Sequence, residues 1–295
     1  MQVSFDPKKI LTKALGRGGE FSEIFVENLR SNSIVAEENK IEKVLAGHDA
    51  GAGVRVIHGG RTVYGYSNDL TEASLLDLAD AVAAAASGAR AEVVDLRRRE
   101  VPRGFEVRER PDTVPLDRKI DMVRRGNAAA RGFGNLVQQV QVVYRDSVQD
   151  VLIANSLGEL SEDRRVQTVY FVQVVAANSD GLIQTGYEPV GGFEGFEIFE
   201  RMPPEDIARV AAERALGMLR ATKAPAGTMP VVMSAEAGGT MVHEAVGHGL
   251  EADLAMNGLS VYTGKRGERV AAECVTVIDD GTLAHRRGSY AVDDE

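Results

Sequence analysis

The chain has 295 residues and a formal net charge of −10, because 34 Lys and Arg face 44 Asp and Glu. Neutralising nucleic-acid phosphates requires a clustered basic surface, so this balance argues against a nucleic-acid-binding protein. With 44% hydrophobic and 26% charged residues, the composition is that of a globular protein and excludes a disordered or fibrous chain.

Cysteine content and the N-terminal sequence predict the cellular location of the protein. The single cysteine, Cys274, excludes an intramolecular disulfide, and we expect it to be a buried core residue, as free cysteines commonly are. The first residues lack the apolar segment of a signal peptide, and no run of about 18 apolar residues occurs. These features predict a cytoplasmic protein that does not associate with a membrane.

The first ninety residues predict two helices with strands between them. Apolar residues recur at helical spacing in Pro7–Leu15 and in the Ala-rich segment Thr71–Ser87, whose N-cap is Thr71 or Asn68. Runs of β-branched and aromatic residues predict strands at Phe21–Asn28, Ser33–Lys43, Gly53–His58 and Arg61–Tyr66. The pair Gly59-Gly60 separates the last two runs and predicts a tight hairpin.

The next part of the chain repeats this mixture of elements. A charged, non-periodic connection, Arg97–Pro115, precedes a helix at Leu116–Arg131. Strands are predicted at Leu136–Tyr144, Gln149–Asn155, Arg165–Ala177 and Gly181–Thr185, followed by a helix at Pro204–Arg220. Helices set between runs of antiparallel strands predict an α+β domain over residues 1–226, ending at Ala224–Gly227. It contains no catalytic cluster, so we expect a scaffold or binding surface.

Residues 227–295 carry the chemistry. A short strand is predicted at Met229–Ser234, and the segment His243-Glu-Ala-Val-Gly-His248 follows it. Two histidines can supply neutral imidazole nitrogens to Zn²⁺, and Glu244 can take a proton from water at the metal. Only five histidines occur in the chain, so a chance pair around a glutamate is improbable.

The spacing of the two histidines requires a local distortion. In a regular helix, residues i and i+5 lie about 140° apart around the axis, so His243 and His248 would not share a face. A π-bulge makes i to i+5 one turn and brings them together. Gly247 and Gly249 are poor helix residues, and we expect the distortion there.

The segment Met241–Asp253, Met-Val-His-Glu-Ala-Val-Gly-His-Gly-Leu-Glu-Ala-Asp, resembles the signature of the TldD/PmbA family of metalloproteases, specifically its TldD-type subunit. Further segments that look like this family are Ile153–Gly158, Gly191–Phe196, Tyr262–Val270, Val275–Thr282 and Gly288–Glu295. The resemblance covers essentially the whole chain and is strongest beyond residue 227.

The resemblance implies a role for each matched residue. His243 and His248 would be zinc ligands, and Glu244 the general base. Glu251 and Asp253 belong to the signature as residues that support the ligands or cap a helix, or they are exposed acids at a helix end. The C-terminal part would begin a β-rich catalytic domain that carries the metal-binding helix.

The family's third ligand is a cysteine further along the C-terminal domain. Cys274 does not match its position, so the resemblance implies that residues 227–295 are an incomplete C-terminal metalloprotease domain, in a chain truncated at its C-terminus. The family further implies a PmbA/TldE-type partner subunit without the His-Glu motif, and unfolded peptide substrates held in extended form.

The prediction is therefore a zinc-dependent peptidase, the catalytic subunit of a heterodimer. Two alternatives stay open: a non-catalytic regulatory or partner protein, and an inactive fragment whose catalytic domain is left open. The intact pair His243 and His248 argues against the inactive paralogue.

Overall fold

The computed structural model describes residues 3–86, 88–101 and 106–293. The chain divides into two compact units. One unit is Met1–Ala221 together with Asp280–Glu295, and the other is Thr222–Asp279.

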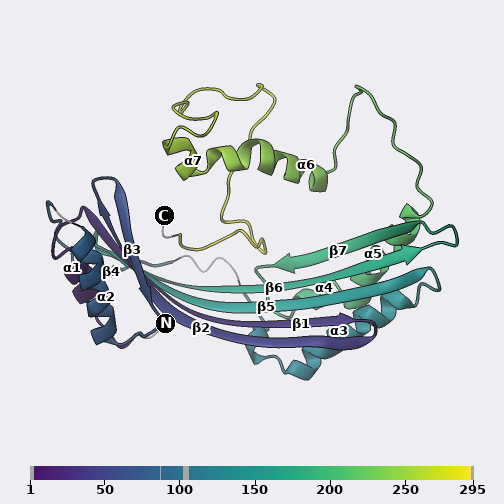
Figure 1. The fold of residues 1–295 in the computed structure, drawn as a ribbon, viewed down its shortest axis with the longest axis horizontal. Coiled ribbons are helices and arrows are strands. Elements are labelled where there is room, and N and C mark those ends of the chain that lie inside the picture. The colour runs from purple at the N-terminus through teal and green to yellow at the C-terminus, as the bar shows by residue number, and fades with distance from the viewer. Residues whose placement is uncertain (1–2, 87, 102–105, 294–295) are drawn as a thin grey trace. The chain divides into compact units, whose positions relative to one another are not determined.

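The larger unit is built on one seven-stranded sheet with the order β3-β2-β1-β5-β6-β4, in which β7 also pairs with β6. Its strands are β1 (Phe21–Glu37), β2 (Lys40–His58), β3 (Arg61–Ser67), β4 (Arg97–Arg98), β5 (Val137–Asn155), β6 (Glu159–Ala177) and β7 (Ile183–Gly192). All pairs are antiparallel except β4 with β6. Figure 1 shows that the long strands bend into a curved sheet.

The strands are longer than the sequence predicts. β1 runs unbroken through Phe21–Asn28 and on to Glu37, where the chain reverses at Glu38 and Asn39 with φ of 48° and 65°. The strand predicted over Ser33–Lys43 is therefore divided by a hairpin turn: residues up to Glu37 belong to β1 and residues from Lys40 belong to β2. Asn39 suits the turn because Asn tolerates the left-handed conformation. The hairpin predicted at Gly59-Gly60 is confirmed, with φ of 55° and 72°.

The described helices and 3₁₀ turns of the larger unit are α1 (Pro7–Ala14), α2 (Glu72–Ala85), η1 (Pro111–Thr113), α3 (Leu116–Arg131), α4 (Ile198–Arg201) and α5 (Pro204–Met218). Thr71, rather than Asn68, caps α2: its side chain accepts a hydrogen bond from the Ser74 N–H at 3.3 Å. No helix of the described ranges is both long and apolar enough to cross a bilayer.

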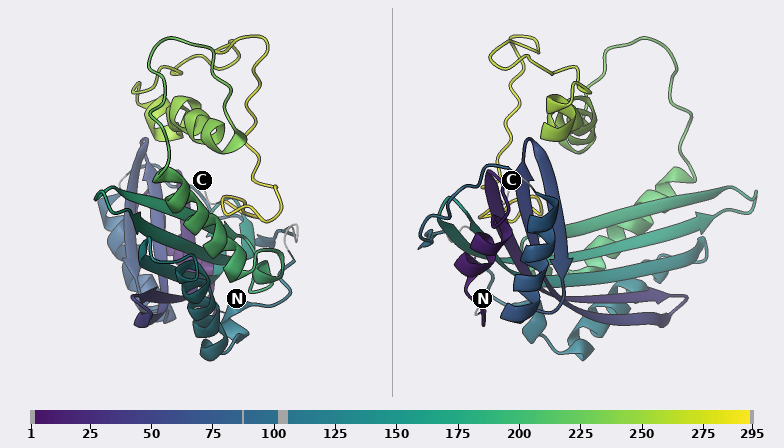
Figure 2. Two further views of the ribbon diagram at one scale, coloured as in Figure 1. Left: turned by 90° about the vertical axis from the view of Figure 1, so that its right-hand side faces the viewer. Right: turned by 60° about the vertical axis from the view of Figure 1, so that its left-hand side comes forward.

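The two larger hydrophobic cores lie on the same face of the sheet. α1 and α2 cover Ile24 and Val26 of β1, whereas α3 and α5 cover Ile34 and Ala36 of the same strand. Because side chains alternate along a strand, these even-numbered positions share a face. Figure 2 shows the two helical groups at the two ends of the strands. The predicted α+β class is confirmed, and among the described residues the opposite face of the sheet carries no helix layer of this unit.

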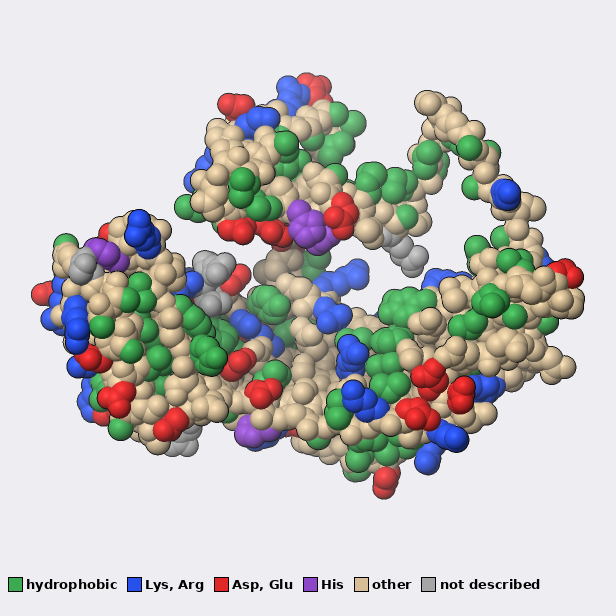
Figure 3. All heavy atoms as spheres, viewed as in Figure 1, with side chains coloured by type: hydrophobic (Ala, Val, Ile, Leu, Met, Phe, Trp, Pro, Cys, Tyr) green, Lys and Arg blue, Asp and Glu red, His purple; other side chains and the backbone are tan. Residues whose placement is uncertain are grey.

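The smaller unit consists of α6 (Ala235–Val242), a π-helix (His243–Gly247), a 3₁₀ turn (His248–Leu250) and α7 (Ala252–Met256). No described residue of Thr222–Asp279 forms a strand, so the strand predicted at Met229–Ser234 is wrong. A strand needs a hydrogen-bonding partner, and this unit provides none among its described residues. Val231 and Val232 accordingly have exposed fractions of 73% and 100%. Figure 3 shows such hydrophobic side chains at the surface.

Candidate metal centre

The two histidines lie on one continuous helical segment of changing pitch. Ser234 begins it as the N-cap of α6, and its side chain accepts a hydrogen bond from the Ala237 N–H at 3.3 Å. The helix then widens into a π-helix over His243–Gly247 and tightens into a 3₁₀ turn from His248. The predicted π-distortion is thereby confirmed, because one π turn carries the chain from His243 to His248.

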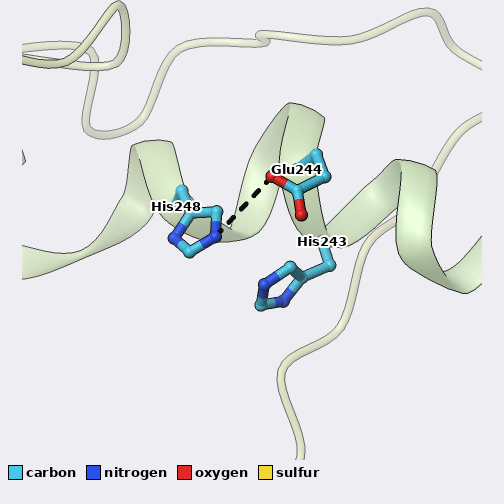
Figure 4. Close-up of side chains that lie close together, drawn as sticks. All are labelled: His243, Glu244 and His248. Atoms are coloured by element: carbon cyan, nitrogen blue, oxygen red, sulfur yellow. Dashed lines mark ion pairs between the residues drawn. The ribbon is translucent and has the colours of Figure 1, made fainter.

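The π turn brings His243, Glu244 and His248 together. The two imidazole rings meet edge to face, with centroids 4.4 Å apart and an interplanar angle of 71°. Glu244 Oε2 lies 3.7 Å from His248 Nε2, the contact drawn as a dashed line in Figure 4. One donor atom from each of the three residues lies within 4.8 Å of the other two. All three side chains are exposed.

This donor set fits a divalent cation such as zinc. Imidazole nitrogens bind zinc at about 2.0–2.1 Å, so two ligands of one ion lie roughly 3–4 Å apart. Small rotations of exposed side chains bring the donor atoms of His243 and His248 within that range. Two imidazoles and a carboxylate are also the ligand types that zinc accepts in hydrolytic sites.

Glu251 contacts the ring nitrogen of His248 that faces away from Glu244. Its Oε1 lies 2.9 Å from His248 Nδ1. A carboxylate at Nδ1 keeps the proton on that nitrogen and leaves Nε2 free to bind a metal. The hydrogen bond and charge of Glu251 raise the pKa of His248 above its ordinary value. A metal ion must displace a proton from a protonated ring, so binding strengthens as the pH rises.

A loop beyond α7 supports the distorted helix. The Tyr262 hydroxyl donates to the Ala245 carbonyl at 3.1 Å, and the Ser260 hydroxyl donates to the Gly249 carbonyl. The Tyr262 ring occupies the space above Gly249, where a Cβ would come within 2.6 Å of it. Gly249 is thus required by close packing. The sequence pattern did not predict the hydrogen bonds from the Ser260 and Tyr262 hydroxyls. The one available signal was that Tyr262 begins a segment that resembles the family.

The remaining residues singled out in the sequence lie apart from this cluster. Asp253 is in the first turn of α7, where its Oδ1 accepts a hydrogen bond from the Leu254 N–H at 2.8 Å. Cys274 is exposed, so the expectation of a buried core thiol is wrong. The smaller unit has almost no buried side chains in its described residues, and it offers no core for this thiol. Cys274 is not part of the group that could hold a metal.

Three domain descriptions of one family match the sequence in order. They are the PmbA/TldA metallopeptidase domain 1 at residues 22–86, the central domain at residues 109–219 and the C-terminal domain at residues 226–295. The last of these contains the His-Glu cluster, and together the three matches span most of the chain.

Several curated proteins are similar over nearly the whole chain. A metalloprotease of Methanothermobacter thermautotrophicus is 32% identical over 94% of this chain and 60% of its own length. A metalloprotease TldD homolog of Haemophilus influenzae is 31% identical, with corresponding shares of 95% and 59%. A zinc metalloprotease TldD homolog of Saccharolobus solfataricus is 23% identical, over 97% and 62%. The chain thus spans about three fifths of the length of these relatives.

Solved structures share the fold at low sequence identity. A putative modulator of DNA gyrase from Bacteroides thetaiotaomicron aligns with a TM-score of 0.74 at 15% identity, covering 90% of this chain and 61% of its own. TldE from Thermococcus kodakarensis aligns with a TM-score of 0.51 at 14% identity, covering 67% of this chain and 44% of its own.

Proposed function

The chain belongs to the PmbA/TldA metallopeptidase family, and we propose that it is the zinc-dependent, TldD-type subunit that hydrolyses unfolded peptides. The observation that carries this proposal is the convergence of His243, Glu244 and His248 on one π turn, with donor atoms within 4.8 Å. Two relatives that are 32% and 31% identical to this chain are named metalloproteases, which supports peptide hydrolysis as the reaction class. The name of the Saccharolobus relative supports zinc as the metal.

In this proposal His243 and His248 hold the metal and Glu244 handles the proton. A bound zinc ion supplies Lewis-acid polarisation of the scissile carbonyl and of the attacking water. Glu244 is next to a ligand and extends toward His248, so its carboxylate is placed to accept the proton of that water. The same group can return the proton to the leaving amine. Glu251 orients His248 through Nδ1.

We further propose a division of labour between the two parts of the chain. Residues 1–226 serve as the scaffold, and residues 227–295 carry the catalytic helix. A PmbA/TldE-type paralogue is the proposed partner, a choice supported by the shared fold with TldE of Thermococcus. Peptides would bind in extended form, because main-chain hydrogen bonds to a strand edge are independent of side-chain identity. β7 is one such edge, since β6 is its strand partner among the described residues.

Replacing His248 with alanine is expected to weaken zinc binding by about a hundredfold. Structural zinc sites provide about 10–16 kcal/mol, which is roughly 3 kcal/mol for each of four ligands. The measurement is a calorimetric zinc titration of the purified chain. His48→Ala removes an exposed histidine of β2 and is the matched control. Equal zinc affinity in the His248→Ala and His48→Ala variants would show that the metal is held elsewhere.

Removing the carboxylate of Glu251 is expected to weaken zinc binding by about 10–100-fold, as loss of a group that orients a ligand commonly does. Glu251→Ala frees His248 Nδ1, so the ring no longer presents Nε2 in one orientation. The same titration measures the effect, with Glu268→Ala as a control at an exposed position of the same unit. An unchanged affinity in Glu251→Ala would show that Glu251 does not orient His248 for the metal.

A further inference from the structure

A cavity of about 530 Å³ opens on the helix-free face of the sheet. Its lining comes from strands β1, β2, β5 and β6 and from the C-terminal segment of the larger unit. Its polar lining includes Ser31, Ser33, Arg145, Ser147, Gln167 and Arg287. The volume falls within the range of small-ligand sites, about 300–1,000 Å³.

Strand register explains why these side chains meet. Ser33 pairs with Arg145, Arg145 pairs with Val169, and Val169 pairs with Gly191, so they form one row across the sheet. Neighbouring strands are about 4.8 Å apart, which places Gly191 about 10 Å from Arg145.

Arg287 reaches the same row from the C-terminal segment of this unit. Its Cδ lies 3.2 Å from where a Cβ on Gly191 would be, so its side chain crosses that glycine. The Gln167 amide donates to the Arg287 carbonyl at 3.2 Å and holds the segment over the sheet.

The adjacent row supplies hydroxyl groups and a hollow floor. Ser31 pairs with Ser147, and Ser147 pairs with Gln167. On the other side Ser31 pairs with Gly47, where a Cβ would come within 3.0 Å of the serine hydroxyl. Small side chains therefore deepen this part of the face.

The cavity carries an unbalanced positive charge. Neither Arg145 nor Arg287 forms an ion pair within the described ranges, whereas the nearby Arg164 pairs with Asp150 at 2.6 Å. The acidic residue at the cavity is Asp146, and its carboxylate is occupied by Lys119 at 2.6 Å and by the Asn32 amide at 2.8 Å. Two unneutralised guanidinium groups thus converge in a protein whose net charge is −10. Figure 3 shows Lys and Arg side chains gathered over the middle of the sheet.

We propose that this cavity is an anchoring site for a carboxylate of a peptide, with Arg145 and Arg287 as its recognition residues. A guanidinium binds a carboxylate through two parallel hydrogen bonds, and two of them converging on one cavity favour an anionic group. The serine hydroxyls and the Gln167 amide can bond the peptide backbone next to it, and Leu45 and Val169 line the apolar part. The choice of a peptide rests on the proposed function.

The test measures binding of an N-terminally fluorescent, unstructured hexapeptide to the full chain by anisotropy, in the presence of EDTA to prevent cleavage. Three forms are compared: a free C-terminal carboxylate, a C-terminal amide, and an amide with one internal glutamate. We expect a form with a carboxylate to bind on the order of tenfold more tightly than the plain amide, because a charge-assisted contact is lost in the amide. Comparing the affinities of the first and third peptides shows whether the cavity binds a C-terminal carboxylate or a glutamate side chain.

Arg145→Gln and Arg287→Gln are each expected to remove that tenfold preference. Arg61→Gln, at the exposed start of β3, should leave it unchanged, and Ser147→Leu should abolish binding by filling the cavity. Thermal melts show whether each variant folds. Equal binding of the three peptides, or competition by inorganic phosphate with no carboxylate preference, would overturn the proposal. Binding is measured without metal, so a failure here leaves metal-dependent cleavage, and hence the proposed function, separately testable.

Discussion

Replacing Glu244 with glutamine is expected to lower peptidase turnover by about 10²–10⁴-fold while zinc binding persists. Glutamine keeps the size and the hydrogen-bonding shape of the side chain but cannot accept a proton from water. His243 and His248 still provide both imidazole nitrogens. Turnover is measured as hydrolysis of an unfolded peptide by this chain together with a PmbA/TldE-type partner, and zinc by metal analysis of the same samples.

The matched control for this prediction is Glu273→Gln, which removes an exposed carboxylate that pairs with Arg269 at 2.6 Å in the same unit. Full turnover in Glu244→Gln would remove Glu244 from the role of base. Loss of zinc from Glu244→Gln would instead make Glu244 a ligand, since its carboxylate lies among the donor atoms of the cluster. The two measurements together therefore separate a proton acceptor from a metal ligand.

The local geometry of the metal centre was predictable because it depends on neighbouring residues. Five positions separate His243 from His248, and only a π turn places both on one side of a helix. The hairpin at Gly59-Gly60 was predictable for the same reason, because two glycines adopt positive φ without steric cost. Such features follow from a few consecutive residues and do not depend on the rest of the fold.

Long strands were harder to predict than turns. The polar residues Arg145, Asp146 and Ser147 lie between two apolar runs and are typical of a loop, yet β5 continues through them. Side chains alternate between the two faces of a strand, which explains how these polar residues fit into β5. Asp146 points toward the helices and pairs with Lys119, while Arg145 and Ser147 point into the cavity. The partner of Asp146 is 27 positions away on α3. No local pattern of residues indicates that pairing.

The smaller unit shows the same dependence on distant partners. Val231 and Val232 have the composition of a strand, but a strand forms only when another strand accepts and donates its backbone hydrogen bonds. Cys274 is exposed for a related reason, because burial requires neighbouring elements to pack against. Composition therefore indicated a strand and a buried thiol in this unit, whereas both depend on contacts with other elements that composition does not reveal.

Replacing Lys119 with methionine is expected to destabilise the larger unit by about 3–5 kcal/mol. The side chains of Lys119 and Asp146 are only 3% and 1% exposed, and their Nζ and Oδ2 atoms are 2.6 Å apart. Methionine fills the space of the lysine stem but leaves the buried Asp146 carboxylate without a cationic partner, while the Asn32 amide still donates to it. Chemical denaturation of the purified chain measures the free energy of unfolding.

A second substitution separates lost charge pairing from lost packing. Asp146→Asn, added to Lys119→Met, removes the unpaired charge and keeps an oxygen that can accept from Asn32, so most of the stability should return. Arg164→Met breaks the more exposed pair with Asp150 and should cost at most about 1 kcal/mol. If the double variant were as unstable as Lys119→Met, lost packing of the lysine stem would account for most of the destabilisation. Recovery would instead show that the cost of Lys119→Met comes from leaving the Asp146 carboxylate buried without a counter-charge.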